Sequence, residues 1–298
     1  MKSINAATTV AILIGATLWS LDEASSKKVY LLDSTTLKNL SWTRYSASHK
    51  SEDGWTEESY TDRGVNWRSY VVCDVHSRNA NNWLRTPFID RWPAKRLYIE
   101  ISFTMRDCKL FPHTALTCKE TFGLYYYESD YDFSSSSLPA WIEASGGGGG
   151  GNATAAYRLI DRIAADRGRF STKDATTSST SVINIETQSI PTFRKGVYFA
   201  FRDEGACTSL LAVKIYYKVC EERTRNFAWF PETPTGYNLS SIEKASGTCI
   251  RNASPMATLP EYLCKADGQW DLLSGGCECD AGYTSIGEEC VGKRQLIV

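Results

Sequence analysis

The chain has 298 residues, 42% of them hydrophobic and 22% charged, which is enough to bury one substantial core and a smaller second unit. Its 33 Lys and Arg residues against 34 Asp and Glu residues give a net charge of -1. That balance provides no field to attract nucleic acid or an anionic membrane, so we expect a protein partner or a small ligand instead.

Residues 1–24 are typical of a secretory signal peptide. An apolar run from Ala6 to Trp19 follows Lys2 and is shorter than the roughly 20 residues that a membrane-spanning helix needs. Ser20 and Ala24 are the candidate cleavage positions. No second apolar stretch reaches membrane-spanning length, so we expect the chain as printed to be secreted, without direct insertion into a membrane.

Export would place the ten cysteines in an oxidising compartment, where an even number of thiols is expected to form disulfides. Glycans are attached to N-x-S/T sequons in the same compartment, although such short motifs also arise by chance. The candidate glycosylation sites are Asn39, Asn152, Asn238 and Asn252.

Short runs rich in Val, Ile, Thr and aromatic residues dominate the first third of the chain and favour strands. They lie at residues 29–36, 40–45, 59–75, 81–89 and 95–105, with loops or turn-forming residues between most of them. Few segments have a helical period, so the sequence predicts an all-β sandwich.

The segment 104–130 predicts a hairpin that is closed by its own disulfide. Two apolar, aromatic-rich strands flank a short loop with Cys108 at one end and Cys118 at the other. A charged pair, Arg106 and Asp107, lies at the edge of this loop. The residues alone leave open whether the hairpin is only structural or also forms one wall of a binding site.

A zinc site is the alternative interpretation of this loop. Cys108, His113 and Cys118 follow the spacing C-x4-H-x4-C, and the fourth ligand would be His49 or His76. We prefer the disulfide, because thiolate ligands compete poorly with oxidation outside the cell and two cysteines flanking a loop can reach disulfide geometry. We therefore expect no metal and no cofactor.

Residues 134–154 form a low-complexity insertion, with four serines at 134–137 and six glycines at 146–151. A phosphate-binding loop would need a following Lys-Ser/Thr and the start of a helix, and neither is present. We interpret the segment as a flexible loop or linker.

Further strands are expected at residues 181–190, 195–203 and 210–220, while residues 156–170 fit either a short helical turn or a strand. Strict alternation in the last of these strands predicts one face that is apolar and one that carries two lysines. The apolar face holds Val213, Ile215, Tyr217 and Val219, and the other face holds Lys214 and Lys218.

The cysteines crowd together after Cys220, among turn residues and with few long apolar runs. They are Cys249, Cys264, Cys277, Cys279 and Cys290. A small unit with so little core needs covalent links, so we expect a disulfide-rich module that begins close to Cys220.

Several stretches carry a family resemblance in chain order. They are VYLLDSTT, NNWLRTPFI, TMRDC, CKETFGLYYYESD, RKGVYFAF, GACTSLLAVKIYYKVC and FPET, followed by GTC and CECDAGY. Together they resemble the start of the ectodomain of Eph receptors, the receptor tyrosine kinases that bind ephrins. The resemblance spans Val29 to Cys290, and the CKETFGLYYYESD stretch is its most specific part.

This resemblance implies a fold and a division into domains. The ligand-binding domain would be a jelly-roll, galactose-binding-like β-sandwich over residues 27–219, interrupted by the insertion at 134–154. A sushi-like module would follow over residues 220–278, and residues 279–298 would begin an epidermal-growth-factor-like repeat. The implied disulfides are Cys73–Cys207, Cys108–Cys118, Cys220–Cys264, Cys249–Cys277 and Cys279–Cys290.

The resemblance also implies an ephrin on an opposing cell as the partner, with contact-dependent signalling and receptor clustering in a full-length receptor. Members of the family grip an extended, largely apolar ephrin loop in a surface channel. Arg106 matches the arginine that meets an acidic residue of that loop. The other implied channel residues are Val71, Cys73, Thr104, Cys207 and Ser209.

Two simpler interpretations compete with this one. Arg106 could be an ordinary surface arginine that pairs with Asp107 or Glu128, an interaction worth only about 0–1 kcal/mol when exposed. The nine Trp and sixteen Tyr residues could instead form the sugar platform of a secreted carbohydrate-binding module, although core packing is their commoner use.

An enzyme is not expected from this chain. The sequence lacks the G-x-S-x-G and H-E-x-x-H motifs and the kinase motifs V-A-I-K, H-R-D and D-F-G. The printed chain stops soon after Cys290. We expect either a soluble form that sequesters ligand or an incomplete gene product, and a plasma-membrane ectodomain if it is part of a full receptor.

Overall fold

The computed structural model describes residues 26–46, 54–62, 64–111, 115–132, 157–166 and 182–293. Several features named above lie outside these residues. They are the expected signal peptide at 1–24, His49, His113, the whole insertion at 134–154 with its Asn152, and the last five residues, 294–298.

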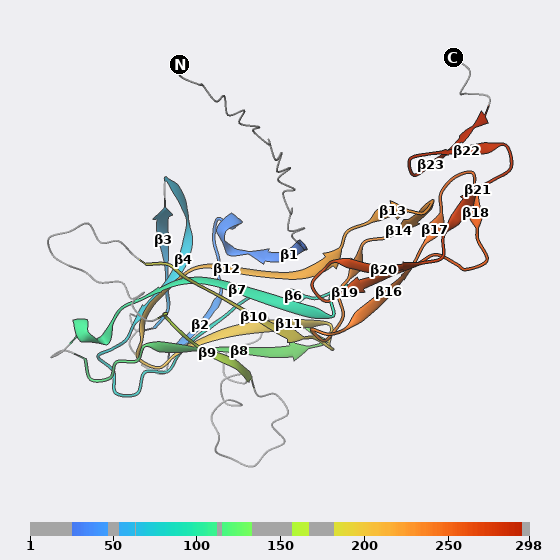
Figure 1. Ribbon diagram of the computed structural model, residues 1–298. Coiled ribbons are helices and arrows are strands. Elements are labelled where there is room, and N and C mark those ends of the chain that lie inside the picture. The colour runs from blue at the N-terminus through green and yellow to red at the C-terminus, as the bar shows by residue number, and fades with distance from the viewer. Residues whose placement is uncertain are drawn as a thin grey trace, which may run out of the picture.

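The larger part of the chain is a sandwich of two antiparallel sheets (Figure 1). The seven-stranded sheet has the order β10–β7–β12–β4–β3, with β1 and β15 also paired to β12. Its strands are β1 (Lys27–Asp33), β3 (Thr56–Asp62), β4 (Val65–Cys73), β7 (Arg96–Met105), β10 (Asn184–Pro191), β12 (Cys207–Cys220) and β15 (Thr233–Pro234). The second sheet packs its apolar face against this one.

That six-stranded sheet has the order β2–β5–β11–β8–β9, with β6 also paired to β11. Its strands are β2 (Thr43–Ser46), β5 (Asn82–Arg85), β6 (Ile89–Asp90), β8 (Thr121–Ser129), β9 (Arg158–Ala164) and β11 (Gly196–Asp203). The segment that fitted either a helical turn or a strand is therefore a strand where it is described. Two short 3-10 helices complete this part of the chain, η1 (Ser34–Thr36) and η2 (Cys108–Leu110).

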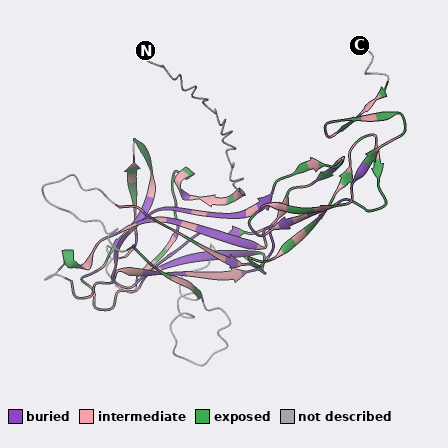
Figure 2. Ribbon diagram, in the orientation of Figure 1, coloured by how far each residue is buried: buried purple, intermediate pink, exposed green. Residues whose placement is uncertain are grey.

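Alternation along β7 builds much of the core between the sheets. Every second side chain of this strand is at most 1% exposed, from Leu97 through Ile99, Ile101 and Phe103 to Met105. Burying one such side chain stabilises the fold by about 1.5–3 kcal/mol. The side chains between them point to the outer face, where Arg96 and Tyr98 are also buried and the rest of the strand is half-buried (Figure 2).

Strand β12 confirms the predicted alternation, but only beyond an irregularity. Val213, Ile215, Tyr217 and Val219 belong to the core, and Lys214 and Lys218 lie over tyrosine rings. The register with β7 shifts between Leu210 and Ala212. Because this bulge inserts one residue, Ser209 faces outward although simple alternation would place it on the same face as Val213.

A small disulfide-rich module extends from one end of the sandwich (Figure 1). Two three-stranded sheets and two two-stranded sheets make it up. The three-stranded sheets are β13 (Arg223–Arg225), β14 (Ala228–Phe230) and β17 (Thr248–Cys249), and β16 (Ile242–Ser246), β19 (Glu261–Lys265) and β20 (Trp270–Ser274). The two-stranded sheets are β18 (Ala253–Pro255) with β21 (Cys277–Cys279), and β22 (Tyr283–Ile286) with β23 (Glu289–Gly292). Its core centres on Phe230 and Tyr262, whose ring centroids are 5.2 Å apart. The predicted fold class, a β-sandwich followed by a disulfide-rich module, is confirmed.

Five disulfides join the ten cysteines in the pairs that the resemblance implies. Two of them lie in the sandwich, Cys73–Cys207 and Cys108–Cys118. The other three are Cys220–Cys264, Cys249–Cys277 and Cys279–Cys290. Within the described residues, no helix combines the length and apolar character needed to cross a membrane.

Candidate functional site

The six residues that the resemblance implies for binding lie together at one end of the seven-stranded sheet. Strand β12 runs between β4 and β7, and its pairings with both strands align their residues in rows. We name the set the six-residue patch. One row is Thr104, Ser209 and Val71, and the next is Arg106, Cys207 and Cys73, in which the Arg106 N–H donates to the Cys207 carbonyl at 2.9 Å.

The six-residue patch belongs to the outer face of the sheet. Val72, Met105 and Thr208 alternate with its members along the three strands, and each is at most 3% exposed because it points into the sandwich. Side chains on a strand alternate between its two faces, so the patch residues point the other way. The bulge in β12 makes this possible for Ser209.

A disulfide holds two of the three strands beneath this patch. Cys73 and Cys207 lie directly opposite each other in the register of β4 and β12, and their bond closes a sequence separation of 134 residues. Closing so long a loop restricts the unfolded chain and contributes about 2–5 kcal/mol to stability on a chain-entropy estimate.

The second disulfide of the sandwich, Cys108–Cys118, closes the loop between β7 and β8. The predicted hairpin is wrong, because β7 pairs with β10 and β12 in one sheet and β8 pairs with β9 and β11 in the other, so this loop connects the two sheets. Two carboxylates fix the start of this loop. Asp107 caps η2 by accepting the Lys109 N–H at 2.8 Å, and Glu120 accepts the Cys108 N–H at 2.9 Å. The bond uses both sulfur atoms that the zinc interpretation requires, and in the described part of the chain no three His, Cys, Asp or Glu side chains gather to hold a metal.

Arg106 is half-buried at the edge of the six-residue patch, and its guanidinium has no hydrogen bond or ion pair among the residues that the structure describes. The two alternative partners are engaged elsewhere. Asp107 caps η2, and Glu128 accepts the Phe193 N–H at 2.6 Å near the opposite end of β8. Among the described residues, no carboxylate pairs with the positive charge that Arg106 brings to the patch.

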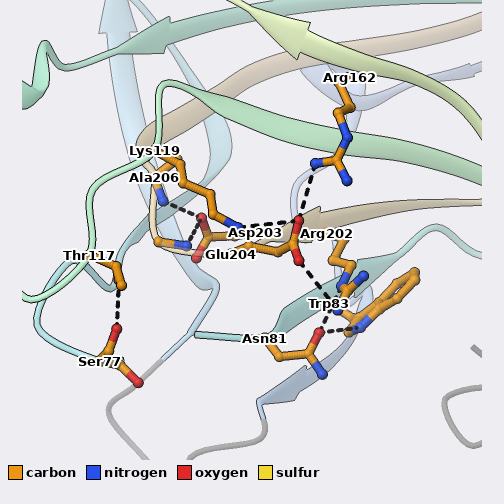
Figure 3. Close-up of polar contacts among 11 residues, drawn as sticks. Ser77, Asn81, Trp83, Thr117, Lys119, Arg162, Arg202, Asp203, Glu204 and Ala206 are labelled. Carbon is orange, nitrogen blue, oxygen red and sulfur yellow. Dashed lines mark hydrogen bonds and ion pairs between the residues drawn. The ribbon is translucent and has the colours of Figure 1, made fainter. Parts of the chain in front are cut away.

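The closed loop is attached to both neighbouring connections. The Leu116 N–H donates to the Val75 carbonyl at 2.9 Å, and the Thr117 hydroxyl donates to the Ser77 carbonyl at 2.7 Å (Figure 3). The Lys119 N–H donates to the Gly205 carbonyl at 2.9 Å. These contacts fix the β7–β8 loop against the β4–β5 loop and the β11–β12 turn.

Asp203 organises the β11–β12 turn from inside the protein. Its fully buried carboxylate accepts the Gly205 N–H at 3.0 Å and the Ala206 N–H at 2.6 Å through one oxygen. The other oxygen accepts the Asn82 side-chain amide at 3.0 Å. Burial raises the pKa of Asp203 above its ordinary value, and these hydrogen bonds offset that effect only in part.

The next residue, Glu204, lies on the surface among three cations (Figure 3). Its carboxylate is 3.2 Å from Arg162 Nη1, 3.5 Å from Arg202 Nη2 and 3.7 Å from Lys119 Nζ. Partial burial opposes ionisation of Glu204, but attraction to Arg202, Lys119 and Arg162 prevails and lowers its pKa. We name these four residues the Glu204 cluster.

Sequence reasoning missed both Asp203 and Glu204. The only available signal was Asp-Glu-Gly between two predicted strands, which indicates a turn and nothing more. Gly205 has a φ of +108°, a conformation that other residues rarely adopt. The cations around Glu204 come from distant parts of the chain, so no local motif could reveal them.

The three described sequons differ in their surroundings. Asn39 is exposed, and Asn238 is exposed in a turn whose backbone accepts the Ser241 N–H at 3.0 Å. Asn252 is half-buried, has a φ of 62° and donates its side-chain amide to the Cys290 carbonyl at 3.4 Å. Occupancy by glycans stays a prediction at all of these sites.

Comparisons with known proteins identify the family of this chain. The family model described as "Ephrin receptor ligand binding domain" matches residues 29–220, and the one described as "Ephrin cysteine rich domain" matches residues 221–279. Ephrin type-B receptor 3 of Mus musculus is 40% identical over 273 residues, which are 91% of this chain and 25% of that protein.

Two further relatives are as similar. Ephrin type-B receptor 3 of Homo sapiens is 41% identical over 251 residues, 84% of this chain and 23% of that protein. Ephrin type-A receptor 7 of Gallus gallus is 39% identical over 269 residues, 89% of this chain and 25% of that protein. The chain thus spans about a quarter of the length of the curated relatives it matches.

Proposed function

Because this chain belongs to the ephrin receptor family and corresponds to the start of its ectodomain, we propose that its sandwich binds an ephrin through the six-residue patch. The observation that carries this proposal is the gathering of the six residues on one outer face, with the half-buried Arg106 guanidinium unpaired among the described residues.

The contact combines apolar burial with one oriented charge pair. An extended, largely apolar loop of the ephrin lies in a channel along the patch, where Val71 and the Cys73–Cys207 bridge supply apolar surface. Thr104 and Ser209 line the same channel. An acidic residue of the ephrin loop meets Arg106, and exclusion of water by the surrounding apolar contacts strengthens that pair.

The proposed division of the chain follows from the same family membership. Residues 27–219 form the ligand-binding domain, residues 220–278 a sushi-like module, and residues 279–298 the start of an epidermal-growth-factor-like repeat. All of these parts are extracellular, since the ten cysteines are paired in disulfides, which persist in oxidising compartments. In a full receptor they serve contact-dependent signalling and clustering.

The test is equilibrium binding of the secreted chain to a panel of A-type and B-type ephrins, with a glycan array run in parallel. Saturable binding to at least one ephrin is expected. Selective binding of one glycan with no signal from any ephrin would favour the carbohydrate-binding alternative. Core packing already accounts for Trp42, Trp55 and Trp83, which are at most 5% exposed.

A further inference from the structure

The four side chains of the Glu204 cluster carry a net positive charge. Lys119 precedes β8, Arg162 lies on β9 and Arg202 lies on β11, so three separate elements place a cation around one carboxylate. Three cations and one carboxylate leave a net charge of +2. A single carboxylate cannot form a close ion pair with all three cations at the same time.

Two of these cations are accessible and the third is held in place. The side chains of Arg162 and Lys119 are 55% and 45% exposed, whereas that of Arg202 is 28% exposed. Arg202 Nε donates to the Asn81 side-chain oxygen at 2.8 Å, and its guanidinium lies over the Trp83 ring at 5.4 Å (Figure 3). The cluster therefore has a fixed base and two cations that can reach a partner.

The cluster and the six-residue patch share the β11–β12 turn. Glu204 begins this turn and Cys207 ends it, and the turn carbonyl of Gly205 accepts the N–H of Lys119. Arg106 and Lys119 flank the two ends of the loop that the Cys108–Cys118 bond closes. Positive charge thus lies on both sides of one rigid connection.

We propose that the Glu204 cluster is a second contact for the protein that binds the six-residue patch, and that it takes an acidic segment of that partner. This inference rests on the proposed function. Charge complementarity and continuity with the patch support it. Exposed charges at the rim of an interface act mainly on association, because they steer the approach of an oppositely charged partner and are screened by salt.

The chain offers a matched control for this cluster. Arg194 is an arginine with 59% side-chain exposure that pairs with Asp130 at 2.6 Å, and it lies just before β11, whereas Glu204 lies just after it. Arg162→Glu and Arg194→Glu change the net charge by the same amount at opposite ends of the sandwich. Association and dissociation rates with the ephrin that binds best would be measured at low and high salt.

Arg162→Glu is expected to slow association by about threefold to tenfold at low salt, with a smaller effect at high salt. Arg194→Glu should change the rate by less than about twofold. Glu204→Gln should accelerate association, because it leaves all three cations available. The thermal unfolding midpoint, measured for each variant, ensures that only folded proteins are compared.

Equal slowing by Arg162→Glu and Arg194→Glu would overturn the inference, since it would reflect net charge alone. Slower association of Glu204→Gln would overturn it as well. If the unmodified chain binds no ephrin, the proposed function fails and this inference fails with it. If the unmodified chain binds and Arg162→Glu binds at the same rate, only the second contact is refuted.

Discussion

Charged side chains are paired to different degrees at the two ends of β11. Before the strand, Asp130 pairs with Arg194 at 2.6 Å and also accepts the Lys195 N–H at 3.1 Å, while Glu128 accepts the Phe193 N–H at 2.6 Å. After the strand, Glu204 forms ion pairs with three cations, and Arg106 has no charged partner among the described residues. The first end is neutralised locally, and the second keeps an excess of positive charge.

The small module occupies the neutralised end. There Phe193 stacks on Tyr237 with ring centroids 5.1 Å apart, and Lys95 pairs with Glu243 at 2.5 Å. The end with excess charge instead carries two disulfides and the loops that hydrogen bonds join. Among the described residues this positively charged end lies away from the small module, which favours the proposed contact with an acidic partner (Figure 1).

The strongest test of this difference in rigidity is a pair of aspartate replacements. Asp203→Ala would leave the Gly205 and Ala206 N–H groups and the Asn82 amide without their buried acceptor, so we expect a loss of about 3–5 kcal/mol in the free energy of unfolding. Asp130→Ala removes an exposed carboxylate and should have a much smaller effect. Urea unfolding followed by Trp fluorescence measures both.

Similar losses for the two variants would mean that the β11–β12 turn is no more rigid than the opposite end. In that case the buried carboxylate would not be the group that fixes the turn.

Much of the fold could be predicted from the sequence because its core follows a local period. Alternation identified the inward face of the second half of β12, and the apolar runs around Cys108 and Cys118 identified the strands β7 and β8, although these two strands do not pair with each other as a hairpin would. The bulge between Leu210 and Ala212 was not predictable, because one inserted residue leaves no mark in the composition of a strand.

Only the part of the candidate site that the family resemblance implied could be predicted from the sequence. Its six residues were implied by motifs. Whether Arg106 forms an ion pair, however, depends on where the side chains of Asp107 and Glu128 lie in the folded protein. Glu128 is near the far end of β8, and Asp107 is turned into the cap of η2. The Glu204 cluster joins residues 119, 162, 202 and 204, which the sheet topology brings together and which local reasoning cannot connect.

A glycine pair tests the rigidity of the turn more gently. Gly205 has a φ of +108°, and an added Cβ would lie 2.9 Å from the Thr117 hydroxyl oxygen. Gly205→Ala should therefore destabilise the protein by about 1–3 kcal/mol and weaken ephrin binding, since it displaces the turn from the β7–β8 loop. Gly64→Ala, with a φ of +81° and open space around the added Cβ, is the control.

The control should share the backbone strain but leave ephrin affinity unchanged. Equal ephrin affinity of the two glycine variants would show that the position of the β11–β12 turn does not affect binding at the six-residue patch.

The smallest expected effect is a difference in pH dependence between the two ends. The pKa of buried Asp203 is raised in the folded protein. At a pH between about 4, where the carboxyl ionises in the unfolded chain, and the raised pKa, the folded state therefore still holds a proton that the unfolded state has released. The stability that this group contributes is lost as the pH rises through that range. The pKa of Asp130 is lowered by the Lys195 N–H and Arg194, so its stabilisation is lost as the pH falls through that lowered pKa.

Free energies of unfolding measured against pH should show these opposite signs. Relative to Asp203→Asn, the unmodified protein loses stability as the pH rises, whereas relative to Asp130→Asn it gains stability over the acidic range. A common sign for the two differences would contradict the assignment of a buried, weakly compensated carboxylate to the turn.

The affinity of Arg106→Glu measures directly whether Arg106 pairs with an acidic residue of an ephrin. We expect that the variant is secreted and folded but binds ephrin at least about 30-fold more weakly, equivalent to about 2 kcal/mol or more. Arg194→Glu, measured beside it, should retain the affinity of the unmodified chain. Unchanged affinity of Arg106→Glu would show that Arg106 does not pair with the ephrin.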